Sequence, residues 1–167
     1  MAGQPIISQC IVSSPDEMSR LGARLAGILA AGDCIGLQGP LGAGKSTLAR
    51  AMITAALAAK GIEAGDVPSP TFTLVQPYPF PATEDAGREI WHLDLWRLED
   101  PEDVIELGLE EALGRHVSLI EWPERMGALM PQQHLMITIT PVEHTGQRQL
   151  DFHAGRDWAE RLSGLGI

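Results

Sequence analysis

The stretch that most constrains how this chain can fold is GPLGAGKS, residues 39–46. It follows the apolar run CIGLQ and opens the segment KSTLARAMITAALAAK, whose many Ala and Leu residues favour a helix. The spacing G-x-x-x-x-G-K-S between a strand and a helix is typical of a loop whose backbone N–H groups surround phosphate. Glycines suit such a loop because larger side chains would collide with the phosphate oxygens. The stretch therefore predicts a phosphate-binding loop.

Two side chains of this loop have chemistry suited to a nucleotide. Lys45 is expected to reach the β- and γ-phosphates, and Ser46 to offer its hydroxyl to Mg²⁺. Lys45 is one of only two lysines in the chain, which favours this role over a solvated loop lysine. Pro40 has no N–H and so cannot donate to phosphate. Ser13 and Ser14, at the end of the first predicted strand, are further candidates for nucleotide contacts.

ATP is the expected nucleotide. The chain contains no asparagine, so it lacks the N-K-x-D element with which GTPases bind guanine. A small-molecule kinase is the alternative, although Arg97, Arg115 and Arg125 are scattered and form no obvious lid over the phosphates. No arginine is plainly placed to act as a finger, so we expect slow hydrolysis by the isolated protein.

Patterns of strand and helix alternate along the chain. We expect strands at residues 5–14, 34–39, 71–78, 88–96, 117–121, 134–141 and 148–154. We expect helices at residues 15–31, 44–60, 100–113, 123–130 and 156–165, the third divided at Gly108. The runs 71–78 and 88–96 are expected to pair as an extended hairpin. The resulting fold class is α/β, a P-loop nucleotide-binding fold with a mixed, mostly parallel sheet flanked by helices, in a single domain over residues 1–167.

Charge and composition limit the partners of the chain. Its formal net charge is −10, with 12 Lys and Arg against 22 Asp and Glu. Nucleic acids are bound through clustered Lys and Arg, so contact with RNA or DNA is expected only through partner proteins. No segment is apolar over the length that a membrane span needs. Cys10 and Cys34 form no CxxC pair and are expected to be buried free thiols, and the chain is expected to be cytoplasmic.

Two acids follow apolar strands and are candidates for completing a magnesium site. They are Asp94 in IWHLDLW and Glu121 in SLIEW. Their spacing does not rank them, and a carboxylate that caps a helix or pairs with arginine is the alternative for each. Side-chain alternation along a strand is expected to turn Trp122 to the face opposite Glu121. His92, inside a predicted strand, is expected to be packed or hydrogen-bonded and not catalytic.

Four motifs together resemble one family. GPLGAGKST, SPTFTLVQPY, HLDLWRLEDPEDVIELGLEEAL and LIEWPER follow the order and spacing seen in TsaE (YjeE-type) proteins, over about residues 14–125. These are bacterial ATPases needed to make threonylcarbamoyladenosine in tRNA. The resemblance implies that Lys45, Ser46 and Thr47 handle phosphate and metal, within an ATP-binding loop made of Gly39, Pro40, Leu41, Gly42, Ala43, Gly44, Lys45, Ser46 and Thr47.

The resemblance also implies roles outside the loop. Glu121 would join Ser46 in holding Mg²⁺, and Trp122 would be functionally important. The residues implied in hydrolysis are Lys45, Thr73, Asp94 and Glu121. Thr73 would bond to the γ-phosphate or its attacking water, whereas Asp94 would either orient water or organise the surroundings of the metal. The chain departs from the family by having Pro40 in place of the usual Asp and Ser46 in place of Thr.

The implied partners are TsaB and TsaD homologues, with tRNA contacted only indirectly. TsaD would transfer a threonylcarbamoyl group to an adenosine of tRNA, and the ATP cycle of this chain would reset the complex. Residues 99–111 contain seven acids and either face a partner or form a solvated helix face. The alternative from another class is a nucleotide-gated binding module in which hydrolysis is incidental.

Overall fold

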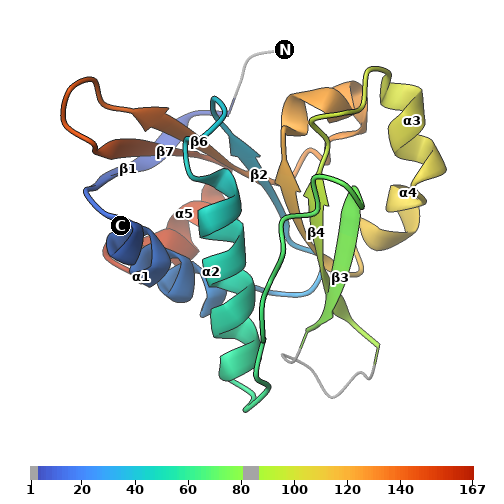
Figure 1. The fold of residues 1–167 in the computed structure, drawn as a ribbon, viewed down its shortest axis with the longest axis horizontal. Helices are drawn as coiled ribbons and strands as arrows, with labels where there is room; N and C mark the ends of the chain where they lie inside the picture. The colour runs from blue at the N-terminus through green and yellow to red at the C-terminus, as the bar shows by residue number, and fades with distance from the viewer. Residues whose placement is uncertain (1–3, 81–86) are drawn as a thin grey trace.

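The computed structural model describes residues 4–80 and 87–167 and shows a mixed seven-stranded sheet with helices on both faces (Figure 1). Its strands are β1 (Ile6–Val12), β2 (Cys34–Gln38), β3 (Val75–Pro79), β4 (Glu89–Asp94), β5 (Val117–Glu121), β6 (Leu135–Pro141) and β7 (Arg148–His153). Its helices are α1 (Pro15–Ala26), α2 (Lys45–Ala58), α3 (Pro101–Glu106), α4 (Leu109–Ala112), the 3-10 helix η1 (Pro123–Leu129) and α5 (Arg156–Ser163). Within the described residues, no helix has the length and apolar character to cross a membrane.

The strand order is β1-β7-β6-β2-β5-β4-β3, and the sheet is parallel at its centre. β6, β2, β5 and β4 run parallel, whereas β1 with β7, β6 with β7 and β3 with β4 are antiparallel. The predicted fold class and the predicted hairpin of β3 and β4 are both confirmed. A parallel centre requires helical crossovers, which explains the helix between β2 and the later strands.

Side-chain alternation along the strands divides the core between the two faces. α1, α2 and α5 cover one face, with Leu37, Leu119 and Ile137 beneath them. The helices α3, α4 and η1 cover the other face over β4 and β5, with Leu93 and Ile120 beneath them. Figure 1 shows α1 and α2 side by side on their face and α3 and α4 at the opposite end of the molecule.

The two largest differences from the expected element boundaries are at the end of the first helix and the start of β3. The first helix ends at Ala26 instead of continuing to residue 31, because Gly27 caps it by donating to the carbonyls of Arg24 and Leu25. Residues 71–73 form a turn, and β3 begins only at Val75.

The two cysteines differ in burial. Cys34 is buried as expected, and burial raises the pKa of its thiol to about 12. Cys10 is only half-buried because β1 lies at the edge of the sheet, so the prediction of full burial was wrong for that residue. Gly108, with φ 69°, separates α3 from α4 as predicted.

Strand register places the carboxyl ends of three central strands together. Glu121 at the end of β5 lies opposite Leu37 of β2 on one side and Asp94 of β4 on the other. The GPLGAGKS stretch follows β2 directly, so the phosphate-binding loop and both acids meet at this edge. Parallel sheets place ligand sites at this edge of their strands.

Candidate nucleotide-binding site

The loop between β2 and α2 depends on glycine at specific positions. Gly39, Gly42 and Gly44 have φ values of 148°, 75° and 113°, in the left-handed region that other residues rarely adopt. A Cβ at Gly39 would lie 2.4 Å from the carbonyl oxygen of Ile139, so no larger residue fits there. Gly44 begins α2 without a side-chain cap, which leaves the first N–H groups of the helix facing the loop. This geometry suits a bound anion.

The ammonium group of Lys45 is held inside this loop. Its Nζ donates to the carbonyl oxygens of Gly39 (2.7 Å) and Pro40 (3.0 Å). The same atom lies 3.9 Å from the centre of the Trp122 ring, a cation–π contact. Burial lowers the pKa of Lys45, while the charges of Glu121, Glu124 and Asp94 act in the opposite direction. The loop thus holds a positive charge at its centre.

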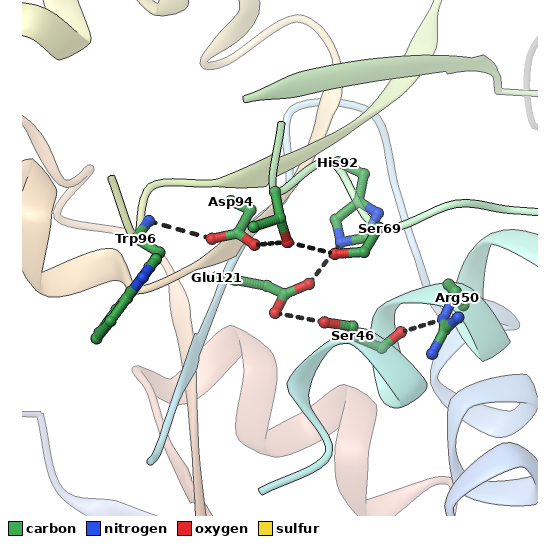
Figure 2. Close-up of polar contacts among 8 residues, drawn as sticks. Ser46, Arg50, Ser69, His92, Asp94, Trp96 and Glu121 are labelled. Carbon is green, nitrogen blue, oxygen red and sulfur yellow. Dashed lines mark hydrogen bonds and ion pairs between the residues drawn. The ribbon is translucent and has the colours of Figure 1, made fainter. Parts of the chain in front are cut away.

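Glu121 connects α2 to β4 through its carboxylate. Its Oε2 accepts a hydrogen bond from the Ser46 hydroxyl at 2.8 Å, and its Oε1 lies 2.9 Å from Nε2 of His92. Figure 2 shows these side chains converging from α2, β5 and β4. Glu121 and His92 are 2% and 0% exposed, so both oxygens of the carboxylate have fixed partners in a buried setting. His92 is packed and hydrogen-bonded, as predicted.

Asp94 belongs to a second, neighbouring set of hydrogen bonds. Its Oδ2 accepts from the Thr71 hydroxyl at 2.6 Å, and that hydroxyl lies 2.9 Å from the Ser69 hydroxyl. Its Oδ1 accepts from the backbone N–H of Trp96 at 3.1 Å. These bonds, visible in Figure 2, tie the turn at residues 70–73 to the end of β4. Asp94 is buried, whereas Thr73, two residues beyond Thr71, is exposed.

Trp122 lies on the same side as Glu121, so the predicted turn to the opposite face was wrong. β5 ends at Glu121, and Trp122 adopts left-handed backbone angles (φ 58°, ψ 50°) as the residue before η1. Strand alternation therefore does not apply to it. Its indole packs on Trp96 with ring centres 4.4 Å apart and contacts Lys45.

Two cavities lie on either side of the phosphate-binding loop and share Gly42, Gly44 and Thr47. One, of about 320 Å³, is lined by Leu41, Gly42, Gly44, Lys45, Ser46, Thr47, Arg50, Thr71, Asp94, Trp96, Glu121 and Trp122. The other, of about 210 Å³, is lined by Val12, Ser13, Ser14, Pro15, Met18, Gly42, Ala43, Gly44, Thr47, Gly146 and Arg148. We call the first the acidic cavity and the second the serine cavity.

The donor atoms in the acidic cavity fit Mg²⁺. This ion prefers oxygen ligands and is commonly held by one or two protein groups together with substrate phosphates. The Ser46 hydroxyl and the Glu121 carboxylate supply such oxygens side by side. Among the described residues, no cluster of three or more His, Cys, Asp or Glu could hold a metal unaided. This donor set suits an ion that binds together with the phosphates.

Comparison with known proteins assigns the family. The model of the family "Threonylcarbamoyl adenosine biosynthesis protein TsaE" matches residues 12–150. The chain belongs to the TsaE family. It is 38% identical over 128 residues to the tRNA threonylcarbamoyladenosine biosynthesis protein TsaE of Rickettsia bellii, covering 77% of this chain and 83% of that protein. It is 37% identical over 134 residues to the protein of the same name in Haemophilus influenzae, covering 75% and 78%.

A solved structure shows the same fold. The crystal structure of Bacillus subtilis YdiB matches with a TM-score of 0.73 over 95% of this chain and 93% of that chain, at 24% sequence identity. The sequence-based resemblance to TsaE proteins and the predicted P-loop fold are therefore both confirmed.

Most residues implied by the TsaE resemblance come together in the acidic cavity. It brings together Lys45, Ser46, Thr47, Asp94, Glu121 and Trp122. Thr73 is not among its lining residues, and the threonine of SPTFT that bonds to Asp94 is Thr71. The contact of Thr73 with the γ-phosphate or its attacking water, which the resemblance implies, stays a prediction. The turn at residues 70–73 is what brings the earlier hydroxyl to the carboxylate.

Two other residues at the site had little signal in the sequence. Arg148, at the start of β7, donates from Nε to the carbonyl oxygen of Ala43 (3.3 Å) and from a terminal nitrogen to that of Gly146 (2.6 Å). It is distant from the loop in sequence, and only the position of β7 brings it close. Phe72, next in sequence to Thr71 of the acidic cavity, is 82% exposed, with the Arg97 guanidinium 4.5 Å from its ring centre.

Proposed function

We propose that this chain is a Mg²⁺-dependent ATPase that supports threonylcarbamoyladenosine modification of tRNA, acting with TsaB and TsaD homologues. The observation that carries the proposal is the acidic cavity, in which Lys45, Ser46, Asp94 and Glu121 surround one side of a phosphate-binding loop. Membership in the TsaE family supports the pathway. The net charge of −10 supports indirect contact with tRNA through the partner proteins.

The roles of the side chains follow from their positions. Lys45 and the loop N–H groups bind the β- and γ-phosphates and offset their charge. Ser46 and Glu121 hold Mg²⁺, which when bound offsets the charge that develops on the transferred phosphoryl group. Asp94, with the Thr71 hydroxyl as its partner, orients the attacking water.

The adenosine end of ATP is assigned to the serine cavity. This cavity continues from the loop past Gly42 and Gly44 and contains the hydroxyls of Ser13 and Ser14. Val12, Pro15 and Met18 give it an apolar wall, which suits a nucleobase.

Slow hydrolysis by the protein alone is part of the proposal. Of the described residues, Arg50 is the arginine that lines the acidic cavity, and its Nε donates to the carbonyl oxygen of Ser46. This bond ties its Nε to the first turn of α2, and no other arginine of the described residues lines the cavity. A partner protein is therefore expected to accelerate the reaction, as arginine fingers do in other P-loop proteins.

Single-turnover hydrolysis of ATP tests the proposal. Lys45→Ala is expected to lower the rate at least roughly a hundredfold, because the charge at the centre of the loop is lost. The matched control is Lys60→Ala, which removes the other lysine, exposed beyond the end of α2, and should leave the rate unchanged. Equal rates in both variants and the parent would contradict the assignment.

Glu121→Gln tests the metal site separately. The amide keeps the size of the side chain but removes its charge, so we expect a large loss of Mg²⁺-dependent hydrolysis with ATP binding retained in the absence of Mg²⁺. Glu160→Gln, on the exposed side of α5, is the matched control.

The binding-module alternative has one observation in its favour. Leu41, which lines the acidic cavity, and Phe72, which follows the lining residue Thr71 in sequence, are each 82% exposed, so a partner could sense the nucleotide there without needing its hydrolysis. Partner turnover sustained over many cycles by a non-hydrolysable ATP analogue would favour this alternative. A kinase has less support. It would need further basic residues over the phosphates, and among the described residues the acidic cavity is lined by two cationic side chains, Lys45 and Arg50.

A further inference from the structure

Among the buried polar residues, His92 is the one whose position in the core the proposed nucleotide site does not yet explain. It lies in the middle of β4, between Gln76 of β3 and Leu119 of β5, and it is 0% exposed. Its Nε2 contacts Glu121, but its Nδ1 is buried and has no hydrogen-bond partner among the described residues. A buried polar atom without a partner destabilises a fold, so an apolar residue would suit the core better at this position.

The contact of His92 with Glu121 fixes the direction of its hydrogen bond. A carboxylate accepts hydrogen bonds, so Nε2 carries the hydrogen and donates to Oε1. The other oxygen, Oε2, accepts from Ser46. With each oxygen held by a different partner, the carboxylate plane cannot rotate freely.

Such a tether is of particular value for a glutamate. Glu121 stands at the end of a strand where the shorter Asp is common, and its side chain has one more rotatable bond. Ordering that extra bond costs conformational entropy. Without a tether, the favourable free energy of metal binding must offset this cost. A hydrogen bond that holds the carboxylate before the ligand arrives removes this cost, as partners of metal ligands do elsewhere.

We propose that His92 is a positioning residue that holds the Glu121 carboxylate in the orientation needed for Mg²⁺. This inference rests on the proposed ATPase function, since it assumes that Glu121 is a metal ligand. It adds a residue to the site that the TsaE resemblance did not assign and that does not itself contact the nucleotide.

Stability and metal dependence, measured together, separate positioning from a merely structural role. His92→Leu removes the donor and also the unpaired Nδ1. It also leaves Oε1 of the buried Glu121 without a partner, so the two effects oppose each other and we expect a thermal unfolding temperature, without nucleotide or metal, close to that of the parent. ATP affinity in EDTA should be unchanged, because the phosphate-binding loop is untouched. The gain in ATP affinity on adding Mg²⁺ should fall by about tenfold or more.

A second pair of variants keeps the test valid if His92→Leu does not fold. His92→Gln and His92→Asn both introduce an amide, but only the longer glutamine can bring an N–H to Oε1. We expect glutamine to restore the Mg²⁺-dependent gain to within about threefold of the parent and asparagine to fail. The matched control is His153→Leu, a half-buried histidine on β7 away from the acidic cavity, which should leave the gain unchanged.

The outcomes distinguish this inference from the function on which it rests. An unchanged Mg²⁺-dependent gain in His92→Leu, or equal behaviour of the glutamine and asparagine variants, would overturn the positioning role while leaving the ATPase proposal intact. A parent protein whose ATP affinity and hydrolysis do not respond to Lys45→Ala would overturn the ATPase proposal itself.

Discussion

The two sides of the phosphate-binding loop are built in different ways. On the side of the acidic cavity, side chains bond to one another: Ser46 to Glu121 and Glu121 to His92. On the side of the serine cavity, Arg148 bonds to backbone carbonyls of the loop and of the β6–β7 turn. Ser13 there is exposed, whereas Glu121 is 2% exposed. One side is a buried network of side chains, and the other is a more open surface held by the backbone.

This difference shows why one side could be recognised in the sequence. Phosphate and Mg²⁺ require particular chemical groups at particular distances, so a lysine, a hydroxyl and a carboxylate must be present. An apolar wall for a base requires mainly a shape, which many residue types can provide. We therefore expect substitutions on the acidic side to affect catalysis and Mg²⁺-dependent binding, and those on the serine side to affect nucleotide affinity alone.

The largest effect is expected at Gly39, the first residue of the loop that separates the two sides. Gly39→Ala places a Cβ 2.4 Å from the Ile139 oxygen at a φ of 148°, and we expect the free energy of unfolding to fall by about 3 kcal/mol. Chemical denaturation without nucleotide measures this. Gly42→Ala is the matched control, because its Cβ would meet nothing within 4 Å and only the backbone cost of about 1 kcal/mol remains. Equal losses would show that close packing at Gly39 is unimportant.

The next effect distinguishes Thr71, which lines the acidic cavity, from Thr73, which does not. Thr71→Val removes the hydroxyl between Ser69 and Asp94 and should lower the single-turnover rate by roughly tenfold to a hundredfold. The family resemblance selects Thr73 instead, so Thr73→Val should be measured beside it. A greater loss in Thr73→Val would favour the resemblance over the observed hydrogen bonds.

On the serine side, Arg148→Ala should act on affinity alone. It breaks the contacts that tie Ala43 to the β6–β7 turn. If the free energy of ATP binding weakens by about 1 kcal/mol, KM for ATP rises roughly fivefold while kcat stays unchanged. Steady-state kinetics separate the two constants. Arg156→Ala, exposed at the start of α5, provides the control. A fall in kcat instead would mean that the two sides are not independent.

The smallest effect is a pH dependence of the acidic side. Burial lowers the pKa of Lys45 below its ordinary value of 10.5, so this lysine loses its proton at a lower pH in the folded protein than in the unfolded chain. Between those two pKa values the unfolded chain binds more protons, so the stability of the free protein rises with pH. Affinity for ATP should fall over the same interval, because the phosphates then meet a neutral amine. Titrating ATP affinity and stability in alkaline buffers checks the opposite signs, and parallel changes would contradict them.

Much of the fold followed from local patterns. The loop motif between a strand and a helix predicted the position of β2 and α2, and alternating apolar patterns predicted the other strands. Strand order could not be predicted, because pairing between distant segments depends on tertiary packing and not on local sequence. The start of β3 was wrong for a related reason: the β-favouring residues 71–73 are bent into a turn by contacts with β4.

The site was predictable where chemistry dictates residue type. Lys45, Ser46 and Glu121 were identified from the sequence and lie together. Trp122 was placed on the wrong face because a strand periodicity was extended one residue past the end of β5. The contact of His92 with Glu121 was not predictable, since the two are 29 positions apart and meet only through the register of β4 and β5.

That register makes the site sensitive to a kind of mutation other than substitution. His92 and Asp94 are two positions apart on β4, so their side chains lie on the same face of the sheet. This is the face covered by α2, and Glu121 of β5 lies on it too. Loss of a single codon within either strand would turn the residues beyond it toward α3 and η1, removing several functional groups from the loop at once. The gene is therefore expected to tolerate many substitutions in these strands more readily than any change in their length.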